Sequence, residues 1–169
     1  MNETVEHPSP HTSDAVALTP LQRRAIEIGV ADAFLVAMTE RLGPDIASQV
    51  FQDAVDRLAS AAADTLREGG AVPGLPGLWE VWGLLGGDGR LDTQLTQLSD
   101  DALRFTVTKC AYAELYRSLG LETTGVAFSC RRDAPFARAL VPGVVVEQSR
   151  TILEGNDRCE FTYTLEADR

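Results

Sequence analysis

Histidine is nearly absent from this sequence, and its position limits the chemistry of the chain. Of 169 residues only His7 and His11 are histidine, and both lie in residues 1–17, which are rich in Pro, Ser, Thr and charge. That segment has no hydrophobic periodicity and is expected to be disordered. Residues 18–169 are expected to form one domain. Without imidazole, that domain excludes a Ser-His-Asp triad, a Cys-His dyad and a histidine-ligated zinc site.

The sequence also lacks the features of membrane and nucleic-acid-binding proteins. No apolar run is long enough to cross a bilayer, and the N-terminus has no signal-peptide pattern, so a cytoplasmic location is expected. Lys and Arg number 15 against 25 Asp and Glu, and this net charge of -10 argues against nucleic acid and anionic membranes as partners. The expected partner is a small-molecule substrate, with no cofactor, and a homodimer is left open.

The first predicted helix has a complete start signal. Thr19 suits the N-cap, Pro20 the first helical position, and Gln22 completes a capping box. Residues 26–38 are apolar on nearly all sides, which predicts a buried helix. Asp32 is the exception in that stretch, and either lines a polar cavity or reaches solvent.

A second helix is predicted from Gly43-Pro44 to about Glu68, where Gly69-Gly70 ends it. It is amphipathic, and its predicted packing face consists of Ile46, Val50, Ala54, Val55, Leu58, Ala61, Ala62 and Leu66. Residues 72–78 read as a turn-rich connector, and residues 78–85, with both tryptophans, as a short helix.

Beyond residue 90 the pattern changes to strand-like alternation. Turn residues at 99–101 and 154–157 separate two pairs of strands. The predicted strands cover 91–98, 102–108, 144–153 and 158–165, and the predicted helices between the hairpins cover 110–119 and 126–140. Because helices and strands are segregated, the fold class is α+β: N-terminal helices packed on an antiparallel sheet of two hairpins, with intervening helices. The two hairpins could pair into one four-stranded sheet.

Three cysteines remain as the candidates for chemistry. An odd number of thiols in a cytoplasmic protein favours free cysteines, and no Cys-x-x-Cys pair suggests zinc, so no metal is expected. Cys110 follows Lys109 at a predicted strand-to-helix junction, where a cation and a helix N-terminus would lower the pKa of the thiol. That is the setting of a nucleophile, although a small buried thiol fits equally well.

Charged residues follow the second cysteine directly. Arg131 and Arg132 after Cys130 could favour a thiolate or bind a substrate carboxylate. Asp133 is either a general acid-base group or the N-cap of the next helix. Further along, Cys159 alternates with apolar residues and reads as core, while Arg150 is either an exposed strand residue or an anion-binding group.

The order of these short motifs resembles the L-2-amino-thiazoline-4-carboxylic acid hydrolase family. The resemblance covers about residues 104–163, and the N-terminal helices carry no such motif. It is carried by Lys109-Cys110-Ala-Tyr-Ala, Leu119-Gly-Leu, Phe128-Ser-Cys130-Arg-Arg-Asp133, Leu140-Val-Pro-Gly, Ser149-Arg150-Thr, Glu154-Gly and Cys159-Glu-Phe. The sequence departs from the family pattern at Ala111, where Pro is expected, and at Glu160, where Asp is expected.

The resemblance implies hydrolytic opening of a small cyclic amidine or thiazoline-type ring that carries a carboxylate. It implies catalytic roles for Cys110, Cys130, Asp133 and Cys159, with Arg131 or Arg150 holding the substrate carboxylate. Three alternatives stay open: a ring-forming or ring-rearranging biosynthetic enzyme of the same family, a small-ligand binding module whose cysteines are core residues, and an interaction protein that uses the second helix.

Overall fold

The structure, a computed structural model, describes residues 17–70 and 73–165. The expected disordered tail therefore lies almost wholly outside the described residues, as does the start of the expected connector at residues 72–78. No helix in the described part of the chain is long and apolar enough to cross a membrane.

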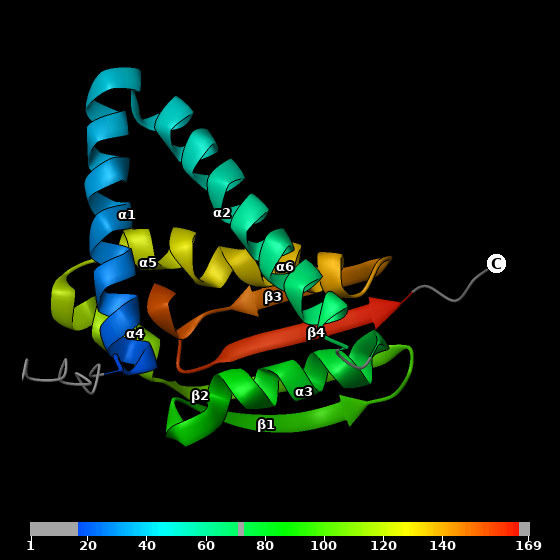
Figure 1. Ribbon diagram of the computed structural model, residues 1–169. Coiled ribbons are helices and arrows are strands. Elements are labelled where there is room, and N and C mark those ends of the chain that lie inside the picture. The colour runs from blue at the N-terminus through cyan, green and yellow to red at the C-terminus, as the bar shows by residue number, and fades with distance from the viewer. Residues whose placement is uncertain (1–16, 71–72, 166–169) are drawn as a thin grey trace, which may run out of the picture.

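Two long helices, α1 (Pro20–Leu42) and α2 (Pro44–Glu68), form a hairpin that rises from the rest of the molecule (Figure 1). The capping box of α1 is present as predicted: the Gln22 amide donates to Thr19 Oγ1 at 3.2 Å, and the Thr19 amide donates to Gln22 Oε1 at 3.0 Å. Gly43 joins the helices with φ 81°, a left-handed conformation that favours glycine.

The four strands form one antiparallel sheet, so both predicted hairpins are confirmed. The strands are β1 (Leu91–Leu98), β2 (Ala102–Cys110), β3 (Val144–Arg150) and β4 (Cys159–Leu165), in the order β1-β2-β4-β3. The central pair β2 and β4 joins the hairpins, with Val107 opposite Cys159. On the covered face of these strands Phe105, Phe161 and Tyr163 stack, with ring centroids 4.9–6.1 Å apart.

Shorter helices connect and cover the sheet: α3 (Gly74–Gly86), α4 (Ala111–Leu119), α5 (Glu122–Phe128) and α6 (Asp133–Leu140). Trp82 of α3 packs on Phe105 and Phe161, with centroids 4.9 Å away in both cases. These contacts place α3 over the centre of the sheet. The α+β fold class, with helices packed on an antiparallel sheet, is confirmed.

The predicted burial of α1 is wrong. Only Ile28 is buried, while Phe34 is 65 % and Val30 53 % exposed. The physical reason is the hairpin: α1 packs on α2, α4 and α5, and its far end extends beyond the sheet (Figure 1). Asp32 lies on the packed side, where it accepts a hydrogen bond of 2.6 Å from the buried Thr124 hydroxyl.

The predicted packing face of α2 is also wrong in most positions. The buried residues lie four apart and are mostly small: Ala47, Phe51, Val55, Ala59 and Ala63. Alanines allow α2 to approach α1 and α6 closely, and this leaves Ile46 and Leu58 at 53 % and 65 % exposure.

Several element boundaries differ from the prediction: the predicted helix over 126–140 is divided into α5 and α6, and β2 extends to Cys110. Two other differences have local reasons. Helix α3 begins at Gly74, in the expected connector, because Pro76 falls in the first helical turn, where no backbone donor is needed. Strand β3 ends at Arg150, because Thr151 caps a 3-10 turn at Ile152–Glu154 by accepting the Glu154 amide at 3.2 Å. That turn directs Ile152 and Leu153 towards the interior, where they line a cavity.

Candidate active site

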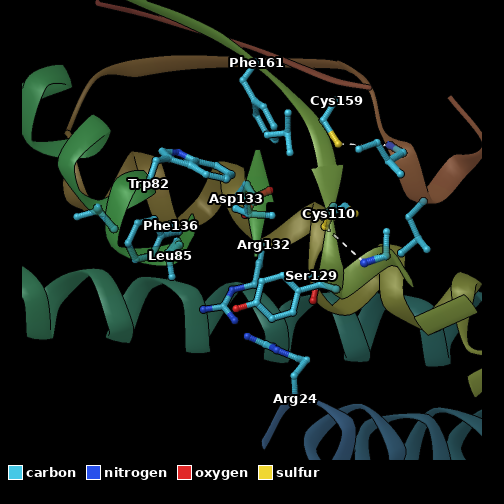
Figure 2. A pocket seen from close by; sticks show the side chains of 18 of the residues that line it. Arg24, Trp82, Leu85, Cys110, Ser129, Arg132, Asp133, Phe136, Cys159 and Phe161 are labelled. Atoms are coloured by element: carbon cyan, nitrogen blue, oxygen red, sulfur yellow. Dashed lines mark hydrogen bonds between the residues drawn. The ribbon is translucent and has the colours of Figure 1, made fainter. Parts of the chain in front are cut away.

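A cavity of about 570 Å³ lies between the sheet and the helices. Most of its lining is apolar or aromatic, and its charged side chains are Arg24, Arg132 and Asp133 (Figure 2). The side chains used below are Arg24, Trp82, Leu85, Cys110, Tyr116, Ser129, Cys130, Arg132, Asp133, Phe136, Cys159 and Phe161.

All three cysteines and Asp133 line this cavity. Cys110 ends β2, Cys130 begins the 3-10 turn before α6, Asp133 is the first residue of α6, and Cys159 begins β4. Four groups from different elements of the sequence therefore converge on one space. All three thiols are free.

Cys110 is the N-cap of α4, and its Sγ accepts a hydrogen bond of 3.4 Å from the Ala113 amide. The expected lowering of its pKa does not occur. Burial raises the pKa of the Cys110 thiol above its ordinary value, and the amides of Ala113 and Tyr112 offset only part of this effect. Lys109 is exposed and does not line the cavity.

The other two thiols are shifted in the same direction. Burial raises the pKa of Cys159 to about 11, although its Sγ accepts the Ile152 amide at 3.3 Å. Burial, and next the negative charge of Asp133, raise the pKa of Cys130 well above its ordinary value. All three cysteines are therefore neutral thiols near pH 7 in the free protein.

Asp133 is a carboxyl group of the cavity whose pKa lies near neutrality. Burial raises its pKa to about 7, and the guanidinium groups of Arg132 and Arg24 counteract only part of that shift. It does not cap α6 as the alternative interpretation expected: Arg132 occupies the N-cap position and Asp133 makes no capping hydrogen bond. A carboxyl group half-ionised near neutrality can both accept and donate a proton.

Arg24 and Arg132 both line the cavity. Sequence reasoning named Arg132 as a possible carboxylate-binding residue, as a pair with Arg131, and assigned no such role to Arg24. Arg132 precedes Asp133, and Arg24 reaches the cavity from α1, its guanidinium carbon 5.2 Å from the centre of the Phe128 ring. The amphipathic pattern gave no signal for Arg24, because only the docking of α1 on α4 and α5 brings it inward. The hydroxyl groups of Tyr116 and Ser129, which also line the cavity, share a hydrogen bond of 2.5 Å.

The two arginines that were predicted to hold a carboxylate do not line the cavity. Arg131 is exposed to solvent. Arg150, at the end of β3, has a half-exposed side chain whose Nε lies 3.9 Å from Glu160 Oε2. Among the described residues, no group of three or more His, Cys, Asp or Glu side chains is arranged to hold a metal ion.

Comparison with solved structures identifies a similar fold. The phenol-responsive sensory domain of the transcription activator PoxR, solved with phenol, matches with a TM-score of 0.51 and 10 % identity. The match covers 82 % of this chain and 73 % of that one. Among curated proteins, no match is found.

Comparison with protein-family models agrees with the resemblance of the cysteine-containing motifs and extends it towards the N-terminus. The model of L-2-amino-thiazoline-4-carboxylic acid hydrolase matches residues 23–163, which include α2, all but the first three residues of α1, and every residue that lines the cavity. The chain belongs to the L-2-amino-thiazoline-4-carboxylic acid hydrolase family.

Proposed function

We propose that this protein is a cysteine-dependent hydrolase that opens a small cyclic amidine or thiazoline-type ring carrying a carboxylate. The observation that carries the proposal is the convergence of three thiols and Asp133 on one cavity. Membership of a family named for such a hydrolysis supports it. The domain body contains no histidine, so a carboxyl group has to move the protons.

Cys110 is the proposed nucleophile. The Ala113 and Tyr112 amides oppose the effect of burial on its pKa, whereas no such amide opposes burial at Cys130 among the described residues; the negative charge of Asp133 raises the pKa of both thiols. Hydrogen bonds from backbone amides also stabilise negative charge on Sγ while it attacks or leaves. Cys130 and Cys159 then complete the wall around the reacting carbon.

Because Cys110 is a neutral thiol, it needs a base while it attacks. The Asp133 carboxylate accepts the thiol proton as Sγ bonds to the amidine carbon, and then returns it to the ring sulfur as the carbon–sulfur bond of the ring breaks. Water adds to the same carbon, Asp133 takes a water proton, and Sγ leaves with that proton. With 2-aminothiazoline-4-carboxylate the product is N-carbamoyl-cysteine.

The test is turnover of 2-aminothiazoline-4-carboxylate by purified protein, read as the appearance of the carbamoyl product. Cys110→Ala should abolish turnover, and Asp133→Asn should lower it by about a hundredfold or more. Ser118→Ala, a small change at an exposed position of α4, is the control. Full turnover by both Cys110→Ala and Cys130→Ala, each shown to be folded by circular dichroism, overturns the proposal.

A non-covalent ligand-binding module is the second candidate, and two observations favour it. All three thiols have raised pKa values, as expected of core cysteines. The fold is also similar to that of a sensory domain solved with phenol. Acid quenching during incubation with the ring compound separates the two: the hydrolase gives a mass adduct on Cys110, and the binding module gives none. A ring-rearranging enzyme of the same family would give the adduct without the carbamoyl product.

A further inference from the structure

The cavity is larger than the ring in the family's name requires. Its volume of about 570 Å³ lies within the range of about 300–1,000 Å³ that proteins use for drug-sized ligands. An aminothiazoline carboxylate is a single five-membered ring with two small substituents and fills only part of this space. A ligand that matches the cavity has a further group, and the lining residues indicate its chemistry.

One side of the cavity is aromatic and aliphatic. Figure 2 shows Trp82, Phe136 and Leu85 together on this side, away from Cys110 and Cys159. Trp82 packs against the rings of Phe105 and Phe161, which fix its position. A fixed aromatic wall of this kind binds flat or bulky apolar groups, because their burial removes apolar surface from water.

In contrast to the apolar side, the cavity wall formed by Arg24 and Arg132 carries positive charge (Figure 2). Arg24 Nη1 is buried and has no hydrogen-bond partner among the described residues. Its ion pair with Glu27 Oε2, at 3.4 Å on the same helix, lacks hydrogen-bond geometry. No ion pair or side-chain hydrogen bond joins the Arg132 guanidinium to another described residue. Burial, and next the positive charge of Arg24, lower the pKa of Arg132, and the negative charges of Asp133 and Glu27 offset only part of this effect.

Two guanidinium groups held close together in a partly buried place repel each other unless an anion lies between them. Planar carboxylates are well suited to this position, since guanidinium groups donate paired hydrogen bonds to them. Buried donors without partners also favour a ligand that accepts from them.

We propose that the cavity binds an amphipathic acid, a molecule with a carboxylate at one end and a bulky apolar group at the other. Arg24 and Arg132 bind the carboxylate, in place of Arg131 and Arg150. Trp82, Phe136 and Leu85 bind the apolar group. This inference builds on the proposed function, in that the reacting ring would lie between the two ends, next to Cys110 and Asp133. The substrate class is then a ring acid with a large aromatic or aliphatic substituent.

Binding can be measured apart from turnover by calorimetry with three unreactive probes. Phenylbutyrate has both ends, butyrate lacks the apolar end, and phenylbutanamide lacks the charge. Phenylbutyrate should bind the full-length protein at least tenfold more tightly than either of the others, because a hydrogen-bonded charge and a buried ring each contribute about one power of ten or more. Absence of phenylbutyrate binding up to its solubility limit, or equal affinity for the amide or for butyrate, overturns the inference.

Substitutions assign the charged end. Arg24→Gln and Arg132→Gln should each weaken phenylbutyrate binding by about tenfold and leave phenylbutanamide binding unchanged, which also shows that the variants are folded. Arg138→Gln, at an exposed position of α6, is the control. Arg131→Gln tests the neighbour that the sequence favoured. A loss at Arg131 equal to the loss at Arg132 contradicts the assignment.

A second pair of variants assigns the apolar end. Leu85→Trp fills that side of the cavity and should abolish phenylbutyrate binding, whereas Leu84→Trp, at a position that is 72 % exposed and outside the lining, should not. Unchanged binding by Leu85→Trp overturns the placement. The two proposals can fail separately. If the protein binds phenylbutyrate as described but opens no ring, only the hydrolase proposal is refuted. If it opens the ring but does not bind phenylbutyrate, only the amphipathic-ligand proposal is refuted.

Discussion

Asp133→Asn should stabilise the protein, and increasingly so as the pH rises. The Asp133 pKa is raised from 3.8 to about 7 by burial, so the folded state holds its proton more tightly than the unfolded state does. The sign follows from linkage: where the pH exceeds the unfolded pKa, unfolding releases that proton and the carboxyl group costs stability. Asparagine has the same shape, is neutral at every pH, and avoids this cost.

The magnitude follows from the two pKa values. With 1.36 kcal/mol for each unit, the cost of Asp133 is about 2 kcal/mol at about pH 5, where the group is still protonated in the folded state. At about pH 8 it is about 4 kcal/mol, because the full shift then applies. The advantage of Asp133→Asn should therefore grow by about 2 to 3 kcal/mol between these conditions.

Urea unfolding followed by circular dichroism at both pH values measures the difference directly. Asp53→Asn, at an exposed position of α2, controls for the change in net charge. If the free energies of unfolding of wild type and Asp133→Asn differ by the same amount at both pH values, the raised pKa is refuted. The acid-base role proposed for this carboxyl group is then refuted as well.

Three further predictions test other parts of the structure. Gly125→Ala should lower the free energy of unfolding by about 1 to 3 kcal/mol, because its Cβ would lie 2.5 Å from a ring carbon of Tyr116, and an unaltered melting temperature would contradict this packing. In chemical denaturation, Ile28→Ala should lower the free energy of unfolding by about 2 to 5 kcal/mol and Phe34→Ala by about 0.5 kcal/mol or less. Equal losses would instead support the buried helix that the sequence predicted. Iodoacetamide should label all three thiols more slowly than free cysteine at neutral pH in a mass-spectrometric time course, since only thiolates react, and rapid labelling of any of them would contradict its raised pKa.

The strands were predictable because their chemistry is local. Leu103, Phe105 and Val107 alternate with polar residues in β2. Because one face of the sheet is covered, the residues that the alternation places on that face are the ones that are buried. Helix α1 was not predictable in the same way. Its apolar residues, such as Phe34, predict burial, but burial depends on which elements reach that part of the helix, and this hairpin extends past the sheet.

The same distinction between local pattern and tertiary packing applies to the candidate site. The cysteines and Asp133 could be found because they belong to short ordered motifs, and the cavity brings them together. Their pKa values could not be predicted, because burial is a property of the folded surroundings: Lys109, next to Cys110 in sequence, is exposed and does not line the cavity. Arg24 lies more than eighty positions from Cys110, and nothing in its local sequence marks it as a cavity residue.

The charges inside the cavity connect the two proposals. A bound carboxylate would neutralise part of the positive charge of Arg24 and Arg132. In the free protein, that charge lowers the pKa of Asp133 and offsets part of the effect of burial. Binding an anion there therefore raises the pKa of Asp133 further and favours its protonated form. By linkage, the anion in turn binds more tightly when Asp133 carries a proton. In the proposed mechanism, however, the ionised Asp133 carboxylate has to accept the Cys110 proton, so the proposed turnover should increase as the pH rises through the Asp133 pKa of the bound protein.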